Sequence, residues 1–138
     1  MSFNEKIWGE VRRHADRLTA VRAWVRNAHW SAGRGWTHEK LDDLTEAIDE
    51  WTDECVEIAA GETGYVPGKV LGQADPAMGA WAEPADAAGL AVMVLEMVQS
   101  FRNAIEETDS YALKGAAEGA IAEFAKLAYL LRMGRAER

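Results

Sequence analysis

The chain has 138 residues, which fits one domain with a sizeable core and leaves little room for a second. Hydrophobic residues make up 49% and charged residues 28%, a globular composition that excludes a disordered chain or a membrane-embedded protein. The net charge is -8, and lysine and arginine are scattered rather than clustered. The electrostatic attraction that dominates nucleic-acid binding is therefore missing.

The sequence also predicts a cytoplasmic protein. No stretch approaches about eighteen consecutive apolar residues, and the first residues lack the basic-then-apolar order of a signal peptide. The single Cys55 cannot form an intrachain disulfide, which agrees with a reducing compartment. Because Cys55 falls in an apolar helical stripe, we interpret it as a packing residue rather than a nucleophile.

Apolar residues recur at helical spacing through the first half of the chain. This spacing predicts one helix over about 4–30 and a second from an N-cap at Thr37 to about Ala60, with Gly61 as its stop. The stretch 31–35 holds two glycines where the chain must turn. The expected core positions are Ile7, Val11, Leu18, Val21 and Val25, then Leu41, Leu44, Ile48, Trp51, Cys55 and Ile58.

The second half begins with an irregular segment. Residues 62–84 contain all three prolines and predict a long crossover, with room for one short helix. A third helix is expected from Pro84 to about Glu107, and Asp109–Ser110 is the expected cap of a fourth. The expected core positions are Leu90, Met93, Val94, Met97, Phe101 and Ile105, then Leu113, Ala116, Ala120, Ile121, Phe124, Leu127 and Leu131.

The order of these elements reduces the number of folds that the chain could adopt. Two hairpins of long helices joined by one long crossover are the connectivity of ferritin-like bundles, whereas up-and-down bundles have short loops throughout. No strand pattern occurs. We therefore predict an all-α, ferritin-like four-helix bundle that forms a single domain over residues 1–138.

The second predicted helix is strongly acidic. Between His38 and Glu57 it holds nine acidic residues and one lysine. Like charges at helical spacing cost a few tenths of a kcal/mol per pair, so a strip without basic partners suggests that a cation offsets it. The alternative is a solvated helix face. The strip, whose members fall within roughly 100° of one another, consists of His38, Asp42, Glu46, Asp49, Asp53 and Glu57.

His29 lies at the end of the first predicted helix. It continues the stripe that faces the bundle, where a histidine is commonly a hydrogen-bonded core residue. The short turn after it brings His29 and His38 toward the same end of the hairpin. Imidazole together with carboxylates suits iron, manganese or zinc, so the two histidines and the acidic strip predict a metal site.

Several of these residues form a familiar pattern, which resembles the ferroxidase signature of the Dps family of mini-ferritins, the DNA-binding proteins from starved cells. The similarity covers nearly the whole chain, including an alanine-rich last helix. The matching segments are Ala28-His29-Trp30, His38-Glu39-x-Leu41-Asp42, Asp53-x-x-x-Glu57 and Phe101-Arg-Asn-Ala-Ile105.

The resemblance implies a particular site. His29, His38 and Asp42 of one subunit would face Asp53 and Glu57 of a two-fold-related neighbour and bind ferrous iron between them. It also implies oxidation of that iron, with hydrogen peroxide as the favoured oxidant. The ferric product would be stored as mineral inside a hollow dodecamer built from two-fold dimers, which protects against oxidative damage.

Four sequence features bear on this expectation. Trp30, beside the site, would donate an electron to a stray oxidant, or it is a core or interface aromatic. The turn from His29 to His38 is shorter than is usual in the family, and Ile58 follows Glu57 where the family often has arginine. Only Lys6 is basic among the first ten residues, so we expect little or no DNA binding.

Two other functions fit the same residues. One is a Dps-like oligomeric scaffold that binds zinc or another divalent cation without turnover. The other is a plain helical oligomer with an acidic surface. An intrabundle di-iron site is disfavoured because no histidine has a glutamate three residues before it.

Overall fold

The computed structural model describes residues 2–72, 78 and 81–136. Its elements are α1 (Phe3–Ser31), α2 (Trp36–Thr63), α3 (Ala87–Ala104) and α4 (Tyr111–Ala136), and the described residues contain no strand. The predicted all-α four-helix bundle is confirmed. Among the described helices, none combines the length and apolar character needed to cross a membrane.

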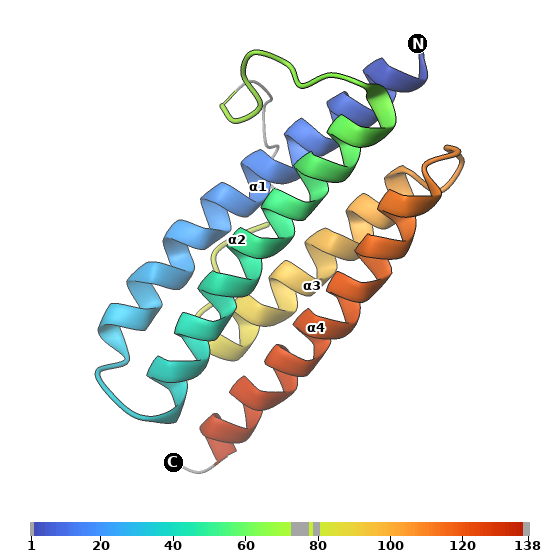
Figure 1. The fold of residues 1–138 in the computed structure, drawn as a ribbon. Coiled ribbons are helices and arrows are strands. Elements are labelled where there is room, and N and C mark those ends of the chain that lie inside the picture. Colours follow the sequence, from blue (N-terminus) through green and yellow to red (C-terminus); the bar gives the residue numbers. More distant parts are fainter. Residues whose placement is uncertain (1, 73–77, 79–80, 137–138) are drawn as a thin grey trace.

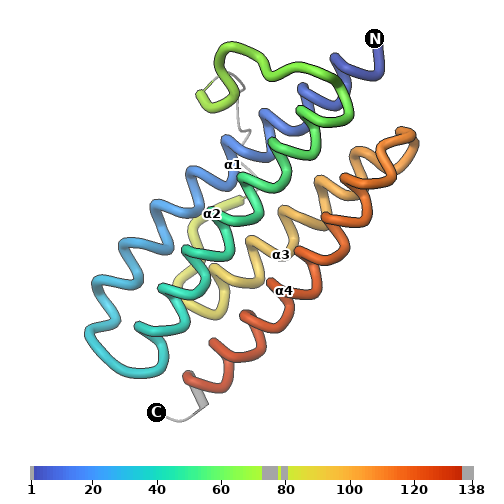
Figure 2. Tube along the Cα trace, in the orientation of Figure 1, coloured from blue at the N-terminus to red at the C-terminus, as the bar shows by residue number. Residues whose placement is uncertain are grey.

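The helices pack as two antiparallel hairpins (Figure 1). Helix α1 packs on α2 and α3, and α4 packs on α3 and α2, so each helix has two antiparallel neighbours. Helix α2 ends beside the start of α1, whereas α3 starts at the opposite end of the bundle (Figure 2). The connection between α2 and α3 therefore has to span the length of the bundle, as the predicted long crossover requires.

The long connection is bound to α1 where it leaves α2. The buried Asp16 carboxylate accepts a hydrogen bond of 2.6 Å from the backbone N–H of Gly72, and Arg12 donates one of 3.1 Å to the carbonyl of Lys69. These bonds satisfy backbone groups that have no helix or sheet partner. Met78, a described residue of the connection, has the 3-10 helical conformation, and its carbonyl accepts a hydrogen bond of 2.8 Å from the N–H of Trp81. The rest of the short helix for which the sequence leaves room falls on residues 73–77 and 79–80, outside the described residues.

The core lies along the four apolar stripes. Most predicted core residues are buried, and each large one contributes roughly 1.5–3 kcal/mol by leaving water. The prediction is wrong in degree at four positions, which are only half-buried because they lie at the edges of the stripes: Ile58, Ala116, Ala120 and Ile121.

Helix α2 begins and ends at different residues from those predicted. Its N-cap is Gly35, whose φ of 102° is accessible to glycine, and Thr37 lies inside the helix. It runs past Gly61 and ends at Gly64 in the left-handed conformation, with φ of 84°. The last turn is held by a tertiary contact, because Trp8 Nε1–H donates to Thr63 Oγ1 at 2.9 Å.

The turn between α3 and α4 also differs from the prediction. Helix α3 starts after its N-cap Asp86 and ends at Ala104 rather than near Glu107, where the hydrogen bonds tighten into short turns. Ser110 precedes α4 as expected. The carboxylate that serves the first turn of α4, however, is Glu62 at the end of α2: its Oε1 accepts from Ser110 Oγ at 2.7 Å and from the N–H of Leu113 at 3.2 Å.

Replacing Glu62→Ala should lower the free energy of unfolding by about 1–2 kcal/mol, because the first turn of α4 loses its acceptor and a favourable negative charge. Urea unfolding followed by circular dichroism measures this change. Glu62→Gln keeps an acceptor oxygen and should lose less than Glu62→Ala. Equal stability of Glu62→Ala and the native chain would contradict the capping role.

Candidate metal site

The two histidines of the first hairpin lie against each other. His29 is in the last turn of α1, His38 is in the first turn of α2, and their ring centroids are 3.9 Å apart with 28° between the planes. His29 is buried, with 8% of its surface exposed, and His38 is half-buried. The prediction that the short turn brings both histidines to one end of the hairpin is confirmed.

Each histidine also bonds to the backbone of the other. His29 Nδ1 lies 3.0 Å from the carbonyl oxygen of His38, and His38 Nδ1 lies 3.0 Å from the carbonyl oxygen of His29. A carbonyl oxygen can only accept a hydrogen bond, so each Nδ1 must carry the proton. In the neutral rings, Nε2 then has a free lone pair.

This arrangement is compatible with metal binding by the two histidines. Metal-binding histidines almost always donate their other ring N–H to a carbonyl or carboxylate, which fixes the ring and its tautomer. The bond from His38 also satisfies a carbonyl in the last turn of α1, where the helix leaves such groups without partners. His29 is therefore a hydrogen-bonded core residue, which was the alternative to a metal ligand, and its role as a ligand stays a prediction.

The acidic strip of α2 has basic partners that its own sequence does not show. Arg22 of α1 binds Asp49 through two hydrogen bonds of 2.7 and 3.0 Å, and Arg26, one turn later, lies 3.4 Å from Asp42. The expectation that the strip lacks basic partners is thus wrong at these two positions. Both pairs are partly exposed, so each contributes little to stability.

The remaining predicted ligands lie far along α2. Asp53 is 15 residues after His38, which corresponds to about 22 Å along a helix, and Glu57 is one turn further. Both side chains are exposed. Within the described part of the chain, no group of three or more histidine, cysteine, aspartate or glutamate side chains is arranged to hold a metal ion. One chain brings together His29 and His38 but not the full predicted ligand set.

Trp30 lies at the surface beside the histidine pair. Its side chain is 64% exposed, and the Arg26 guanidinium stands 5.1 Å from the ring centroid. The interpretation of Trp30 as a core aromatic is therefore wrong. Its roles as an interface aromatic or as an electron donor remain predictions.

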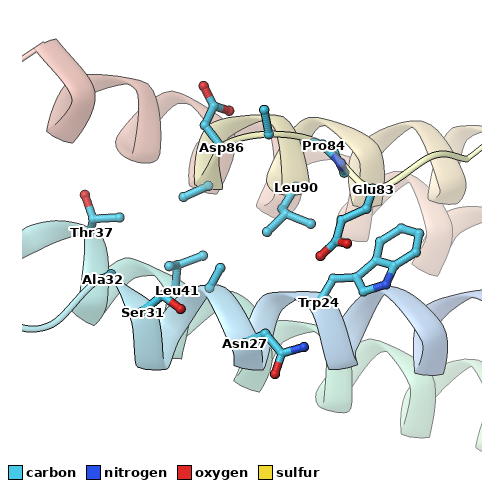
Figure 3. A pocket seen from close by; sticks show the side chains of 13 residues that line it. Trp24, Asn27, Ser31, Ala32, Thr37, Leu41, Glu83, Pro84, Asp86 and Leu90 are labelled. Carbon is cyan, nitrogen blue, oxygen red and sulfur yellow. The ribbon is translucent and has the colours of Figure 1, made fainter.

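A cavity of about 390 Å³ opens near the same end of the bundle, between α1, α2 and the start of α3 (Figure 3). Trp24 and Asn27 of α1 and Glu83 before α3 lie along it. None of the predicted site residues lines this cavity. It is therefore separate from the candidate metal site.

Sequence reasoning missed one buried histidine. His14 Nε2 accepts a hydrogen bond of 2.8 Å from Trp51 Nε1–H, and its ring stacks on Phe101 with centroids 4.5 Å apart. Burial, and secondarily the positive charge of Arg17, lower the pKa of His14 to about 3. His14 is a neutral packing residue, and its place between two core positions of the first stripe was the available signal.

Cys55 is buried, as its position in the apolar stripe predicts. Burial raises the pKa of its thiol, and the negative charge of Glu54 adds to this effect. The thiol is therefore protonated and unreactive at neutral pH, which fits a packing role.

Comparison of the chain with protein-family models, with curated proteins and with solved structures found no match. The resemblance to the Dps family therefore rests on the motifs of this sequence alone.

Proposed function

We propose that two copies of this chain bind ferrous iron between them and oxidise it, in the manner of a Dps-like ferroxidase. One copy contributes His29 and His38 through their Nε2 atoms, with Asp42 one turn further on α2. The second copy contributes Asp53 and Glu57. The observation that supports this proposal is the pair of reciprocal bonds from Nδ1 to carbonyl oxygen, which leaves both Nε2 lone pairs free.

The ligand chemistry suits iron oxidation. Carboxylates stabilise a ferric ion more than a ferrous ion because the interaction grows with metal charge, so oxidation becomes easier. Before iron binds, Arg26 partly neutralises Asp42. The bound iron takes over that role as a stronger positive charge, which frees the guanidinium.

The oxidant in this proposal is hydrogen peroxide. Two ferrous ions each lose one electron, and the peroxide takes up both electrons and two protons to leave as two waters. The ferric product is stored as mineral inside a homo-oligomeric shell, a dodecamer built from two-fold dimers in the cytoplasm. Removing iron and peroxide together protects the cell from oxidative damage.

A zinc-binding scaffold without turnover is the second candidate. Two fixed imidazoles with free Nε2 atoms, as in His29 and His38, are also a donor set that zinc accepts. Such a protein would bind a divalent ion at the same residues but would not accelerate the loss of ferrous iron. The metal dependence of oxidation therefore separates the two candidates.

The test is anaerobic loading with ferrous iron followed by hydrogen peroxide, with the rise of ferric absorbance as the readout. The native chain should oxidise iron fast and saturably, and His38→Ala or Asp53→Ala should slow this by at least about tenfold. Glu96→Gln, an exposed glutamate on α3, should leave the rate unchanged. Oxidation no faster than in buffer would reject the ferroxidase proposal, and calorimetry with zinc would then test the scaffold.

A further inference from the structure

We infer that Trp30 of one copy of this chain inserts into a cavity of a second copy, an inference that rests on the proposed function. The receiving cavity, the Leu71 cavity, has a volume of about 440 Å³ and lies between α1, α2 and the connection that follows α2. Asp53, a ligand of the proposed iron site, lines it. The apolar part of its lining consists of Leu18, Ile48 and Leu71.

Trp30 and the Leu71 cavity lie on the same face of the molecule. Trp30 follows Arg26 and Arg22 at intervals of four residues, so the three side chains form one stripe along α1. Arg22 lines the cavity, and the Arg26 guanidinium stands 5.1 Å from the Trp30 ring centroid. Trp30 lies about 12 Å beyond Arg22 along the helix and does not line the cavity of its own chain. One face therefore carries both an exposed aromatic side chain and a separate cavity.

A two-fold pair of chains brings these two features together. In such a pair, every contact of one residue with another is made twice, once in each direction. The proposed iron site sets His29 of one copy against Asp53 of the other. Trp30 is the chain neighbour of His29, and Asp53 lines the Leu71 cavity. The pairing that completes the iron site therefore places each Trp30 at the Leu71 cavity of the other copy.

The size and charge of the Leu71 cavity fit this occupant. An apolar protein cavity of roughly 150 Å³ holds a benzene ring, so a cavity of about 440 Å³ has room for an indole. Trp30 is 64% exposed in the single chain, and tryptophans that enter a partner's pocket are among the strongest anchors of protein interfaces. The cavity lining holds Asp49 and Asp53 but only Arg22 as a basic residue, so its net charge is negative. It complements the positive Arg26 that stands beside Trp30.

The first test follows self-association by analytical ultracentrifugation. Trp30→Ala and Leu71→Ala should each weaken it, Trp30→Ala by at least about tenfold. The double variant should associate about as weakly as Trp30→Ala alone, because both substitutions remove the same contact. Both side chains are more than half exposed in the single chain, so circular dichroism should show an unchanged fold. A monomeric native chain, undiminished association of Trp30→Ala, or additive effects of the two substitutions would overturn the inference.

The second test places a benzophenone amino acid at position 30 and maps its photocrosslinks by mass spectrometry in a mixture of isotope-labelled and unlabelled chains. The crosslinks should join a labelled chain to an unlabelled one and end at Leu71, Ile48 or Leu18. Crosslinks that stay within one chain, or that end elsewhere, would overturn the inference. The readout does not depend on iron. Crosslinks to the cavity in a protein that does not oxidise iron would reject the ferroxidase alone, whereas iron oxidation without these crosslinks would reject the Trp30 contact alone.

Discussion

Mixing His38→Ala subunits with Asp53→Ala subunits should restore about a quarter of the native rate of iron oxidation, although each variant alone should be at least about tenfold slower than the native chain. In a mixed two-fold pair, one site carries both substitutions and the other carries neither. Random exchange makes about half of the pairs mixed, and each of these has one intact site. The measurement is the ferric absorbance after the two variants are unfolded together, refolded and loaded with iron.

The control mixes His29→Ala with His38→Ala. Both histidines come from the same subunit in the proposed site, so every site in a mixed pair still lacks one imidazole, and no activity should return. Recovery in both mixtures would show that the two histidines act in different subunits. Recovery in neither mixture would contradict a site shared between two copies, which is the arrangement that the resemblance to the Dps family implies.

The helices and the histidine pair could be predicted because they depend on local sequence. Apolar residues at helical spacing locate all four helices. The two glycines of the 31–35 turn allow the chain to reverse within a few residues, so His29 and His38 lie close together. The helix ends were predicted less well. Helix α2 continues past Gly61 because Glu62 and Thr63 make contacts with distant residues, which no local pattern contains.

The electrostatics of the site could not be read from α2 alone. Its acidic strip suggests an uncompensated charge, but Arg22 and Arg26 come from the neighbouring helix, and their pairing depends on how the two helices are aligned. On the other side of α2, exposed carboxylates lie beside the glycines of α4, and this proximity also depends on how the helices pack.

Lowering the pH should destabilise this protein through His14. Its pKa is about 3 in the folded chain and about 6.5 when unfolded, because the ring is buried against Trp51 and Phe101 and faces the positive Arg17. Above pH 6.5 the ring is neutral in both states. Below it, only the unfolded chain binds the proton, so the free energy of unfolding falls by up to about 1.4 kcal/mol per pH unit until the folded ring also titrates.

Urea unfolding at about pH 7 and about pH 5 measures this effect in the native chain and in His14→Gln. The glutamine keeps an acceptor for Trp51 Nε1–H but cannot titrate, so it should be less stable at neutral pH, where it loses the stacking on Phe101. Between the two pH values the native chain should lose about 2 kcal/mol more than the variant. An equal fall in the free energy of unfolding in both proteins would contradict this prediction. It would show that carboxylates account for the whole pH dependence and that His14 binds a proton as easily in the bundle as in the unfolded chain.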